Sequence, residues 1–205
     1  MAKATVAVIE YGMGNIRSVM NALDEIGAKG ELVADPERIG SFDKVILPGV
    51  GAFQEAMESL KNHGMDEALG DFVNAGRPLL GICLGMQLVC RNSEENGNHD
   101  GLGWINAEVR SFPRGQGLKV PHMGWNAIRF VKDDPLFKGL ESRLDVYFVH
   151  SYRVESKSSE NVLAQTDYGG MFTSIVRQDN IWGMQFHPEK SQATGLKLLQ
   201  NFTSV

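Results

Sequence analysis

The chain has 205 residues, of which 42% are hydrophobic and 22% are charged, and its formal net charge is −5. A chain of this size and composition is expected to form one globular domain, 1–205, and it contains no basic block of the kind that binds nucleic acid. It has no apolar stretch near the ~20 residues of a membrane span and no apolar signal core at its N-terminus, so a cytoplasmic protein is expected.

The first half of the chain alternates short apolar runs with segments of helical period. Strands are predicted at 5–9, 44–47 and 78–82, and helices at 16–26, 54–61, 65–75 and 84–91. In the first of these helices apolar residues recur at spacings of three and four, and Gly27 is placed to end it. This alternation is typical of βαβ units around a parallel sheet.

The second half is richer in strands. They are predicted at 104–112, 125–131, 145–152, 162–168, 174–177 and 181–187, followed by a last helix at 192–202. The polar stretch 93–100 has the length of a surface loop. Close turns between the strands indicate hairpins added to an open sheet, so the sequence predicts a single α/β domain.

The strongest chemical signal is Gly81-Ile82-Cys83-Leu84-Gly85, between a predicted strand and a predicted helix. This pattern is typical of a nucleophile elbow, in which a sharp turn exposes the central side chain and the glycines leave room for it. The helix N-terminus favours the thiolate form of Cys83. The alternative is a small buried cysteine at a glycine-rich strand end. Cys90, about 10 Å further along the same predicted helix, is too far away for a disulfide and is interpreted as a packing residue.

A thiolate nucleophile needs a proton carrier, and of the five histidines only His187 lies in a segment that would orient it. Pro188 favours an extended conformation for His187, and if that conformation persists, the side chains of His187 and Glu189 point the same way. The two would then form a base and its orienting carboxylate. Without the cysteine upstream, the same segment would indicate only a strand end followed by a turn.

Acyl transfer also needs backbone N–H groups that stabilise the oxyanion. Leu84, directly after the cysteine, offers one, and the glycines of the loop 48–53 could offer another. Because the carboxyl ends of parallel strands meet at one edge of a sheet, the two segments are expected to lie together. The alternative for the loop is an ordinary connection between a strand and a helix.

Other motifs are weaker. Gly12-Met13-Gly14 lacks the third glycine of the dinucleotide fingerprint, and no phosphate loop or zinc-type Cys/His spacing is present, so no cofactor and no metal are expected. The segment 121–126, Pro-His-Met-Gly-Trp-Asn, is interpreted as an exposed turn that either packs on the core or faces a partner.

Taken together, these residues resemble the class I, or triad, glutamine amidotransferases. Within that family the sequence motifs are most similar to those of the glutaminase subunits of imidazole glycerol phosphate synthase. The similar segments are PGVGAF at 48–53, GICLGMQ at 81–87, PHMGWN at 121–126, FVHSY at 148–152 and QFHPEKS at 185–191. The resemblance covers essentially the whole chain. It implies a flavodoxin-like open mixed sheet flanked by helices.

The resemblance also implies residue roles. Cys83 would be the nucleophile, His187 the proton carrier and Glu189 its orienting carboxylate. Gly51 and Leu84 would supply oxyanion contacts, and the amino-acid end of glutamine would be held by Gln87, Glu95 and the backbone of His150, Ser151 and Tyr152.

Members of this family pass ammonia to a (β/α)8-barrel cyclase, which contributes to histidine biosynthesis and to a linked purine precursor. A barrel needs about 250 residues, so the resemblance implies that the cyclase is a separate chain in a heterodimer. The surfaces expected to face it carry Asn15, Met123, Trp125 and Lys190. Three alternatives remain: the glutaminase subunit of another class I amidotransferase, a stand-alone cysteine hydrolase of similar fold, and a non-catalytic module.

Overall fold

The computed structural model describes residues 4–113 and 117–205. The prediction that no signal segment begins the chain also involves residues 1–3, which lie outside the described residues. The helices are α1 (Ile16–Glu25), α2 (Phe53–Asn62), α3 (Met65–Asn74), α4 (Leu84–Leu88) and α5 (Gln192–Ser204). The strands are β1 (Thr5–Ile9), β2 (Lys29–Val33), β3 (Lys44–Gly49), β4 (Leu79–Cys83), β5 (Cys90–Ser93), β6 (His99–Asp100), β7 (Ile105–Ser111), β8 (His122–Phe130), β9 (Arg143–His150), β10 (Tyr152–Ser156), β11 (Val162–Asp167), β12 (Met171–Gln178) and β13 (Ile181–Met184).

The strands form one mixed sheet, as predicted. Its main order is β2-β1-β3-β4-β13-β12-β10-β7-β5-β6, and β11, β8 and β9 extend it from β12. The first five strands of this order are parallel, and β12 pairs antiparallel with β13. The parallel part places the carboxyl ends of β3 and β4 side by side, because Gly49 is in register with Cys83.

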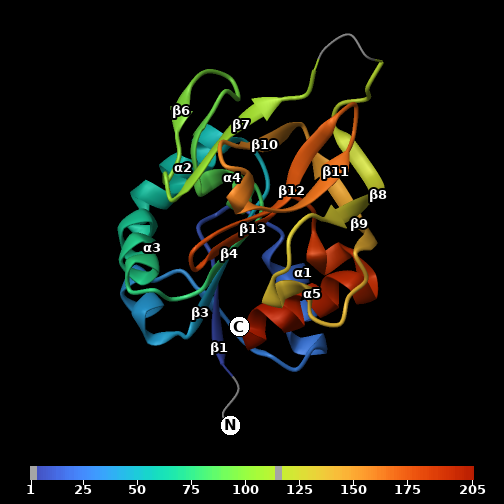
Figure 1. The fold of residues 1–205 in the computed structure, drawn as a ribbon. Helices are drawn as coiled ribbons and strands as arrows, with labels where there is room; N and C mark the ends of the chain where they lie inside the picture. The colour runs from blue at the N-terminus through green and yellow to red at the C-terminus, as the bar shows by residue number, and fades with distance from the viewer. Residues whose placement is uncertain (1–3, 114–116) are drawn as a thin grey trace.

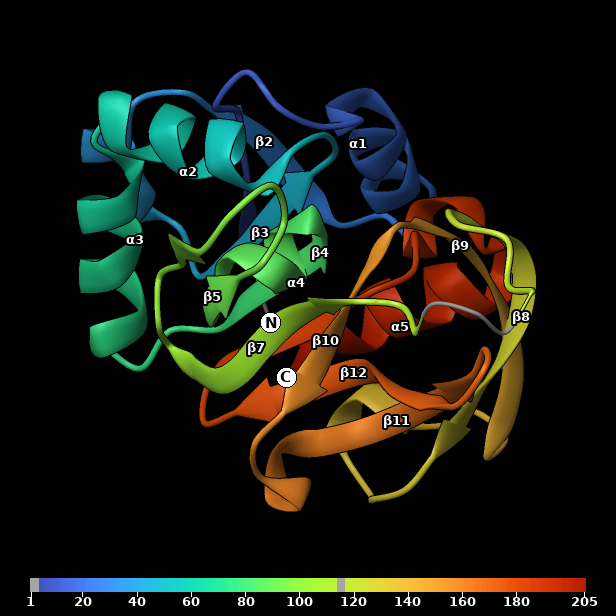
Figure 2. The same ribbon diagram turned by 90° about the horizontal axis from the view of Figure 1, so that it is seen from above.

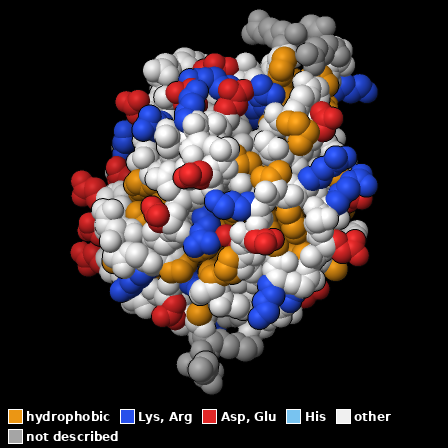
Figure 3. Space-filling view, viewed as in Figure 1, with side chains coloured by type: hydrophobic (Ala, Val, Ile, Leu, Met, Phe, Trp, Pro, Cys, Tyr) orange, Lys and Arg blue, Asp and Glu red, His pale blue; other side chains and the backbone are white. Residues whose placement is uncertain are grey.

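Helices cover both faces of the parallel part of the sheet. Figures 1 and 2 show α2 and α3 on one side and α1 and α5 on the other. Each side has its own buried apolar cluster, one around Phe53 and Leu69, the other around Leu23 and Phe202. Among the described residues no helix is long and apolar enough to cross a membrane. On the face in Figure 3, acidic and basic side chains are interspersed.

The predicted helix 84–91 is wrong in its second half. Helix α4 ends at Leu88, and Cys90 begins strand β5. The carbonyls of Leu88 and Val89 accept hydrogen bonds from the N–H groups of Leu102 and Ile105 at 2.8 and 2.9 Å. Pairing with a distant segment therefore ends the helix, and the predicted loop 93–100 contains the short hairpin of β5 with β6.

Two further predictions in the second half are corrected. The segment 121–126 is not a turn, because β8 begins at His122 and pairs with β9 from His122 opposite His150. The predicted strand 145–152 is β9 as far as His150, where it ends. Ser151 is exposed, and β10 follows as a separate strand, since β9 pairs with β8 whereas β10 pairs with β7. Strand β2 was not predicted, because its sequence, KGELV, has apolar side chains only at its last two positions and no apolar alternation.

Candidate active site

Cys83 stands at the sharp turn from β4 into α4. Its backbone has φ 55° and ψ −109°, a conformation that a side-chain-bearing residue rarely adopts and that is typical of strained functional sites. A Cβ added to Gly85 would lie 1.8 Å from the carbonyl oxygen of Leu47, and one added to Gly81 would lie 2.6 Å from the Gly85 carbonyl. The two glycines therefore allow the close approach that the turn needs, as predicted.

The prediction that the turn exposes the Cys83 side chain is wrong, because Val149 and Gln185 pack against its Sγ and leave 6% of the residue exposed. Its Sγ lies 3.8 Å from the carbonyl oxygen of Val149 on β9, to which the thiol can donate. On another side, Nε2 of Gln185 lies 4.0 Å from Sγ and donates to it. The thiol of Cys83 is thus held between a backbone acceptor and a buried amide donor.

His187 and Glu189 form a buried pair, with Nδ1 of His187 2.8 Å from Oε1 of Glu189. His187 is extended, as predicted, with φ −98° and ψ 96°. The extended conformation does not persist to Glu189, because Pro188–Lys190 is a 3₁₀ turn, and this turn rather than strand alternation brings the two side chains together. A hydrogen bond of 2.9 Å from the N–H of His187 to the carbonyl of Tyr147 fixes the segment to β9.

The charge state of His187 is set by these neighbours. Burial lowers its pKa, but interactions with Cys83 and Glu189 raise it more, and the result is a pKa of about 9. Because Nδ1 is bonded to Glu189, the interaction with Cys83 involves the buried Nε2. His187 is therefore held as a cation at neutral pH, with the proton of Nε2 on the side of Cys83.

A cavity of 320 Å³ opens beside Cys83. It is lined by Val50, Gly51, Cys83, Leu84, Gln87, Glu95, Pro121, Val149, His150, Ser151 and Tyr152. All the residues implied for binding glutamine, and both implied for the oxyanion, line this one cavity, although they come from four segments of the chain. Nε2 of Gln87 donates to the carbonyl of Tyr152 and to Oε1 of Gln185, both at 3.1 Å, which leaves Oε1 of Gln87 for a ligand.

The loop after β3 is tied to its surroundings at both ends. The phenol of Tyr11 donates to the carbonyl of Pro48 at 2.9 Å, and Oε2 of Glu95 accepts the N–H of Phe53 at 2.8 Å. Burial, with a smaller contribution from Cys83, raises the pKa of Tyr11, so its phenol keeps its proton. Between these anchors Gly51 has φ +108°, which a residue with a side chain would adopt only under strain.

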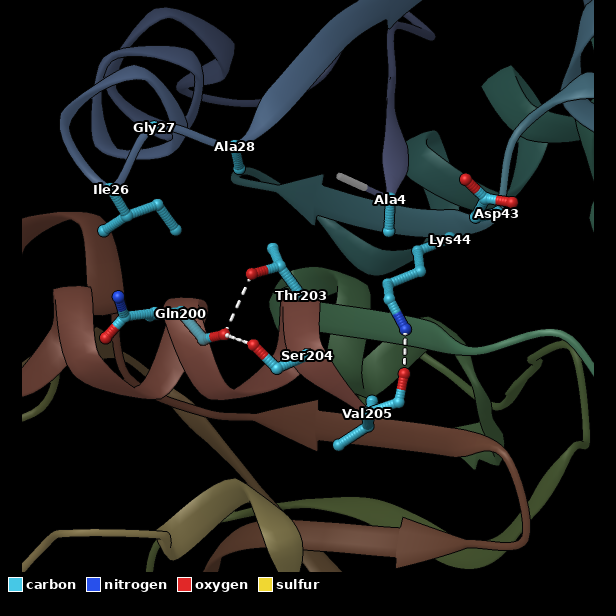
Figure 4. Close-up of a pocket in the computed structure, with 10 residues that line it drawn as sticks. All are labelled: Ala4, Ile26, Gly27, Ala28, Asp43, Lys44, Gln200, Thr203, Ser204 and Val205. Carbon is cyan, nitrogen blue, oxygen red and sulfur yellow. Dashed lines mark hydrogen bonds between the residues drawn. The ribbon is translucent and has the colours of Figure 1, made fainter. Parts of the chain in front are cut away.

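A larger cavity of 680 Å³ lies at the other end of the sheet. Figure 4 shows it between Ala4 and Lys44, at the amino ends of β1 and β3, and the end of α5. Lys44 is bonded there to the carbonyl of Val205. Cys83 lies at the carboxyl end of β4, so this cavity is remote from the nucleophile. No group of three or more His, Cys, Asp or Glu side chains within the described ranges is arranged to hold a metal ion.

The glutamine amidotransferase class-I family matches residues 7–204. The chain is a class I glutamine amidotransferase. The amidotransferase is 49% identical over 201 residues to the imidazole glycerol phosphate synthase subunit HisH of Sulfurimonas denitrificans, covering 97% of each chain. It is 46% identical over 203 residues to the same subunit of Wolinella succinogenes, covering 98% of this chain and 99% of that one. Within the amidotransferases the chain therefore belongs to the HisH family.

Solved structures agree on the fold. A chain of PurLQS from Thermotoga maritima superposes with a TM-score of 0.80 at 17% identity and covers 99% of both chains. A glutamine amidotransferase from the same organism gives a TM-score of 0.67 at 17% identity, covering 100% of this chain and 84% of that one. The predicted mixed sheet flanked by helices is thus the amidotransferase fold.

The residues expected to face a partner lie in two places. Met123 and Trp125 are exposed apolar residues on β8, at 62% and 51%. Asn15, just before α1, lines a small cavity with His187, Glu189 and Val50, and Lys190 is exposed at the end of the 3₁₀ turn. In the amidotransferase Asn15 and Lys190 therefore lie next to His187 and Glu189, whereas Met123 and Trp125 belong to β8.

Sequence reasoning gave no role to Gln185 and Tyr11, which the structure places against the nucleophile and the loop. Gln185 stands inside the segment that contains His187, and a polar residue in a predicted buried strand was the signal available. Tyr11 follows the first strand, and nothing local indicated that its hydroxyl reaches Pro48, 37 positions away. Both assignments need the tertiary structure.

Acid should weaken the fold of the amidotransferase through His122 and His150. Burial lowers the pKa of His122 to about 4 and is the main cause that lowers that of His150 to about 3. An unfolded histidine titrates near pH 6.5, so the unfolded state takes up protons first and the free energy of unfolding should fall as the pH drops from about 6.5 to about 4. Urea unfolding at pH 7 and pH 5 measures this change.

The matched variant for this measurement is His122→Phe, which removes one of the two groups. The hydroxyl and N–H of Ser111 lower the pKa of Glu94. Carboxylates such as this one contribute equally to the pH dependence of the free energy of unfolding in both proteins. The loss of stability between pH 7 and pH 5 should therefore be smaller in the variant. An equal loss in the two proteins would contradict the assignment to His122.

Proposed function

We propose that this chain is the glutaminase subunit of an imidazole glycerol phosphate synthase, which hydrolyses glutamine to glutamate and ammonia. The observation that carries the proposal is the arrangement at the elbow: Cys83, strained and buried, stands beside a cationic His187 that Glu189 orients. The cavity next to Cys83 is lined by every residue assigned to the substrate. Membership of the HisH family supports the identity of the complex.

The first half of the reaction is acyl transfer to sulfur. The thiolate of Cys83 attacks the side-chain carbonyl carbon of glutamine, and the oxyanion that forms accepts hydrogen bonds from the backbone N–H groups of Leu84 and Gly51. As the C–N bond breaks, Nε2 of His187 gives its proton to the leaving amine, which departs as ammonia. The product is a thioester on Cys83, and His187 is left neutral.

The second half is hydrolysis of that thioester. Neutral His187 takes a proton from a water molecule, whose oxygen attacks the acyl carbon, and the C–S bond breaks to release glutamate. This restores the cation at His187 and the thiolate at Cys83. Glu189 stays ionised throughout and stabilises the imidazolium through Nδ1.

The cavity has polar groups suited to the amino-acid end of glutamine. Oε1 of Gln87 can accept a hydrogen bond from the α-ammonium, and the exposed backbone at Ser151 can bind the α-carboxylate. Glu95 adds a negative charge that attracts the ammonium group. The substrate side chain then extends toward Cys83.

We also propose that the ammonia passes to a (β/α)8-barrel cyclase bound as a separate chain. Ammonia released into water would be protonated and lost as a nucleophile, so a protected path to an acceptor is required. The exposed Met123 and Trp125, with Asn15 and Lys190, are the residues proposed to face the cyclase. Exposed aromatic and methionine side chains of this kind are enriched in protein interfaces.

A labelling experiment tests the glutaminase. A diazo-ketone analogue of glutamine should alkylate Cys83, and added glutamine should slow that reaction. Cys83→Ser serves as the control for the site of labelling. Labelling that glutamine does not affect would favour a stand-alone hydrolase, and no labelling at all would favour a non-catalytic module. Co-purification with the cyclase and a coupled glutamine-dependent assay then test the complex.

Glu189→Gln should lower glutaminase kcat by about 10²-fold or more, because the amide neither stabilises the imidazolium nor fixes its orientation. Glu189 is also one of the groups that raise the pKa of His187 to about 9. The variant should therefore lose activity at lower pH on the alkaline side than the wild type does. A pH profile of kcat measures both effects, with Glu67→Gln on the exposed face of α3 as control. An unshifted alkaline limb would contradict the pairing.

A further inference from the structure

A line of buried hydrogen bonds begins on strand β8. Nδ1 of His122 lies 2.9 Å from Nε2 of His150, and Nδ1 of His150 lies 2.7 Å from the carbonyl oxygen of Tyr152. At the outer end, Nδ2 of Asn126 reaches Nε2 of His122 at 3.2 Å and the carbonyl of Asp167 at 3.1 Å. Both histidines are buried, and the line therefore connects β8 with the segment between β9 and β10.

The direction of every proton in this line is determined by its two carbonyl ends. The carbonyl of Tyr152 only accepts, so Nδ1 of His150 carries the hydrogen and Nε2 of the same ring accepts. It follows that Nδ1 of His122 donates to His150. Nε2 of His122 then accepts from Asn126, whose amide is itself oriented by the carbonyl of Asp167. Burial, which lowers the pKa of both histidines, keeps the rings neutral and this pattern intact.

The line continues from Tyr152 to the nucleophile. The same carbonyl accepts from Nε2 of Gln87, which also donates to Oε1 of Gln185, each at 3.1 Å. Since Oε1 of Gln185 faces Gln87, its Nε2 must face Cys83, where it lies 4.0 Å from Sγ. The orientations of the two amides thus follow from the carbonyl that His150 holds.

Aromatic packing fixes the ring of His122. The ring of His122 stacks between Tyr168, at a centroid distance of 3.9 Å, and Phe148, at 4.7 Å. On either side of Gly124 stand Met123 and Trp125, which are exposed. The line therefore has one end beneath an exposed apolar part of β8 and the other end at the reacting sulfur.

We propose that His122 and His150 are positioning residues for glutamine, which act through the carbonyl of Tyr152 on the amide of Gln87. The proposal rests on the proposed function, because it assigns Gln87 and the 150–152 backbone to the substrate. It adds that residues on β8 stabilise the shape of the binding pocket. A substitution at His122 should therefore change the position of Gln87, and with it the affinity for glutamine, through the hydrogen bonds of the line. Neither histidine touches the reacting atoms.

Two variants of His122 separate hydrogen bonding from packing. His122→Phe keeps an aromatic ring between Tyr168 and Phe148 but removes the donor to His150. His122→Asn loses the stack but can place an amide N–H near the position of Nδ1. If the line positions the pocket, the phenylalanine variant is the more damaged of the two in glutamine binding, whereas a packing role predicts the reverse.

The readout is protection of Cys83 from iodoacetamide by glutamine, measured on the full chain. This measures an apparent affinity from occupancy of the site rather than from the rate of hydrolysis. Cys90 does not compete because it is buried and burial raises its pKa. The concentration of glutamine that halves the alkylation rate should rise about tenfold in His122→Phe, the effect of one lost hydrogen bond, and about threefold or less in His122→Asn. Thermal unfolding checks that both variants are folded.

Each outcome decides the proposal. Wild-type affinity in a folded His122→Phe would overturn it and leave the proposed function standing. Absence of protection in the wild type would overturn both. Should His122→Phe fail to fold, Gln185→Met interrupts the line at its other end with little change of volume, and the same tenfold loss of protection is expected. Wild-type protection in that variant would then overturn the proposal.

Discussion

Cys83→Ser should reduce glutamine hydrolysis by about 10⁴-fold or more, because a hydroxyl in this position is not ionised at neutral pH and is a far weaker nucleophile than a thiolate. The substitution changes one atom, and the serine side chain fits the turn that the two glycines allow. Synthesis by the complex should persist when an ammonium salt replaces glutamine, since the cyclase then receives ammonia directly. A coupled assay with each nitrogen source measures the two activities.

Cys90→Ala is the matched control for this experiment. Cys90 is fully buried in β5, and its thiol contacts the carbonyl of Met86 rather than the cavity. This variant should keep glutaminase activity and lose about 1–2 kcal/mol of stability, as expected when a small buried side chain is truncated. Full loss of activity in Cys90→Ala, or retention of it in Cys83→Ser, would contradict the assignment of the nucleophile.

Addition of the cyclase and its ligand should raise the glutaminase rate by about 10²-fold or more, the effect of one oxyanion donor. The physical basis lies in the loop 48–51. Its first residue is fixed, because Tyr11 donates to the carbonyl of Pro48, whereas Val50 is exposed and Gly51 has a positive φ. Rotation of one peptide in this part would add or remove an N–H at the oxyanion with little movement of the rest.

The measurement compares glutamine turnover by the chain alone, with the cyclase, and with the cyclase and its ligand. The rate of Cys83 alkylation under the same three conditions reports the reactivity of the thiol itself. This rate should change much less than the rate of glutamine turnover does. An equal rate in all three conditions would rule out control through the loop. Activation by the cyclase alone would show that binding of the cyclase, rather than binding of its ligand, raises the glutaminase rate.

Local sequence was enough to predict the parts of the site that are built from one segment. The elbow is determined by residues within two positions of Cys83, because glycines at 81 and 85 are what a sharp strand-to-helix turn requires. The neighbouring His187 and Glu189 were also predicted to interact. His187 is extended as predicted, but the extended conformation does not continue to Glu189, since Pro188 begins a 3₁₀ turn.

Elements that depend on distant pairing were predicted less well. Helix α4 ends at Leu88 because N–H groups in 102–105 donate hydrogen bonds to the carbonyls at the end of the helix. The chain breaks between strands at Ser151 because β9 and β10 pair with different strands. Neither cause is visible within a window of neighbouring residues. The same holds for the cavity beside Cys83, whose lining comes from separate loops.

By itself the sequence predicted the fold class, which the structure confirms, and it proposed Cys83 as nucleophile with His187 and Glu189 as its partners, because each prediction rests on short-range patterns of apolar residues, glycines and a proline. Only the tertiary structure decided how the polar groups are oriented around them. The amides of Gln87 and Gln185 and the rings of His122 and His150 can each be placed in more than one way. Gln87, Gln185 and His122 are oriented by partners that lie far away in the chain and close in space, and His150, bonded to the nearby carbonyl of Tyr152, connects them.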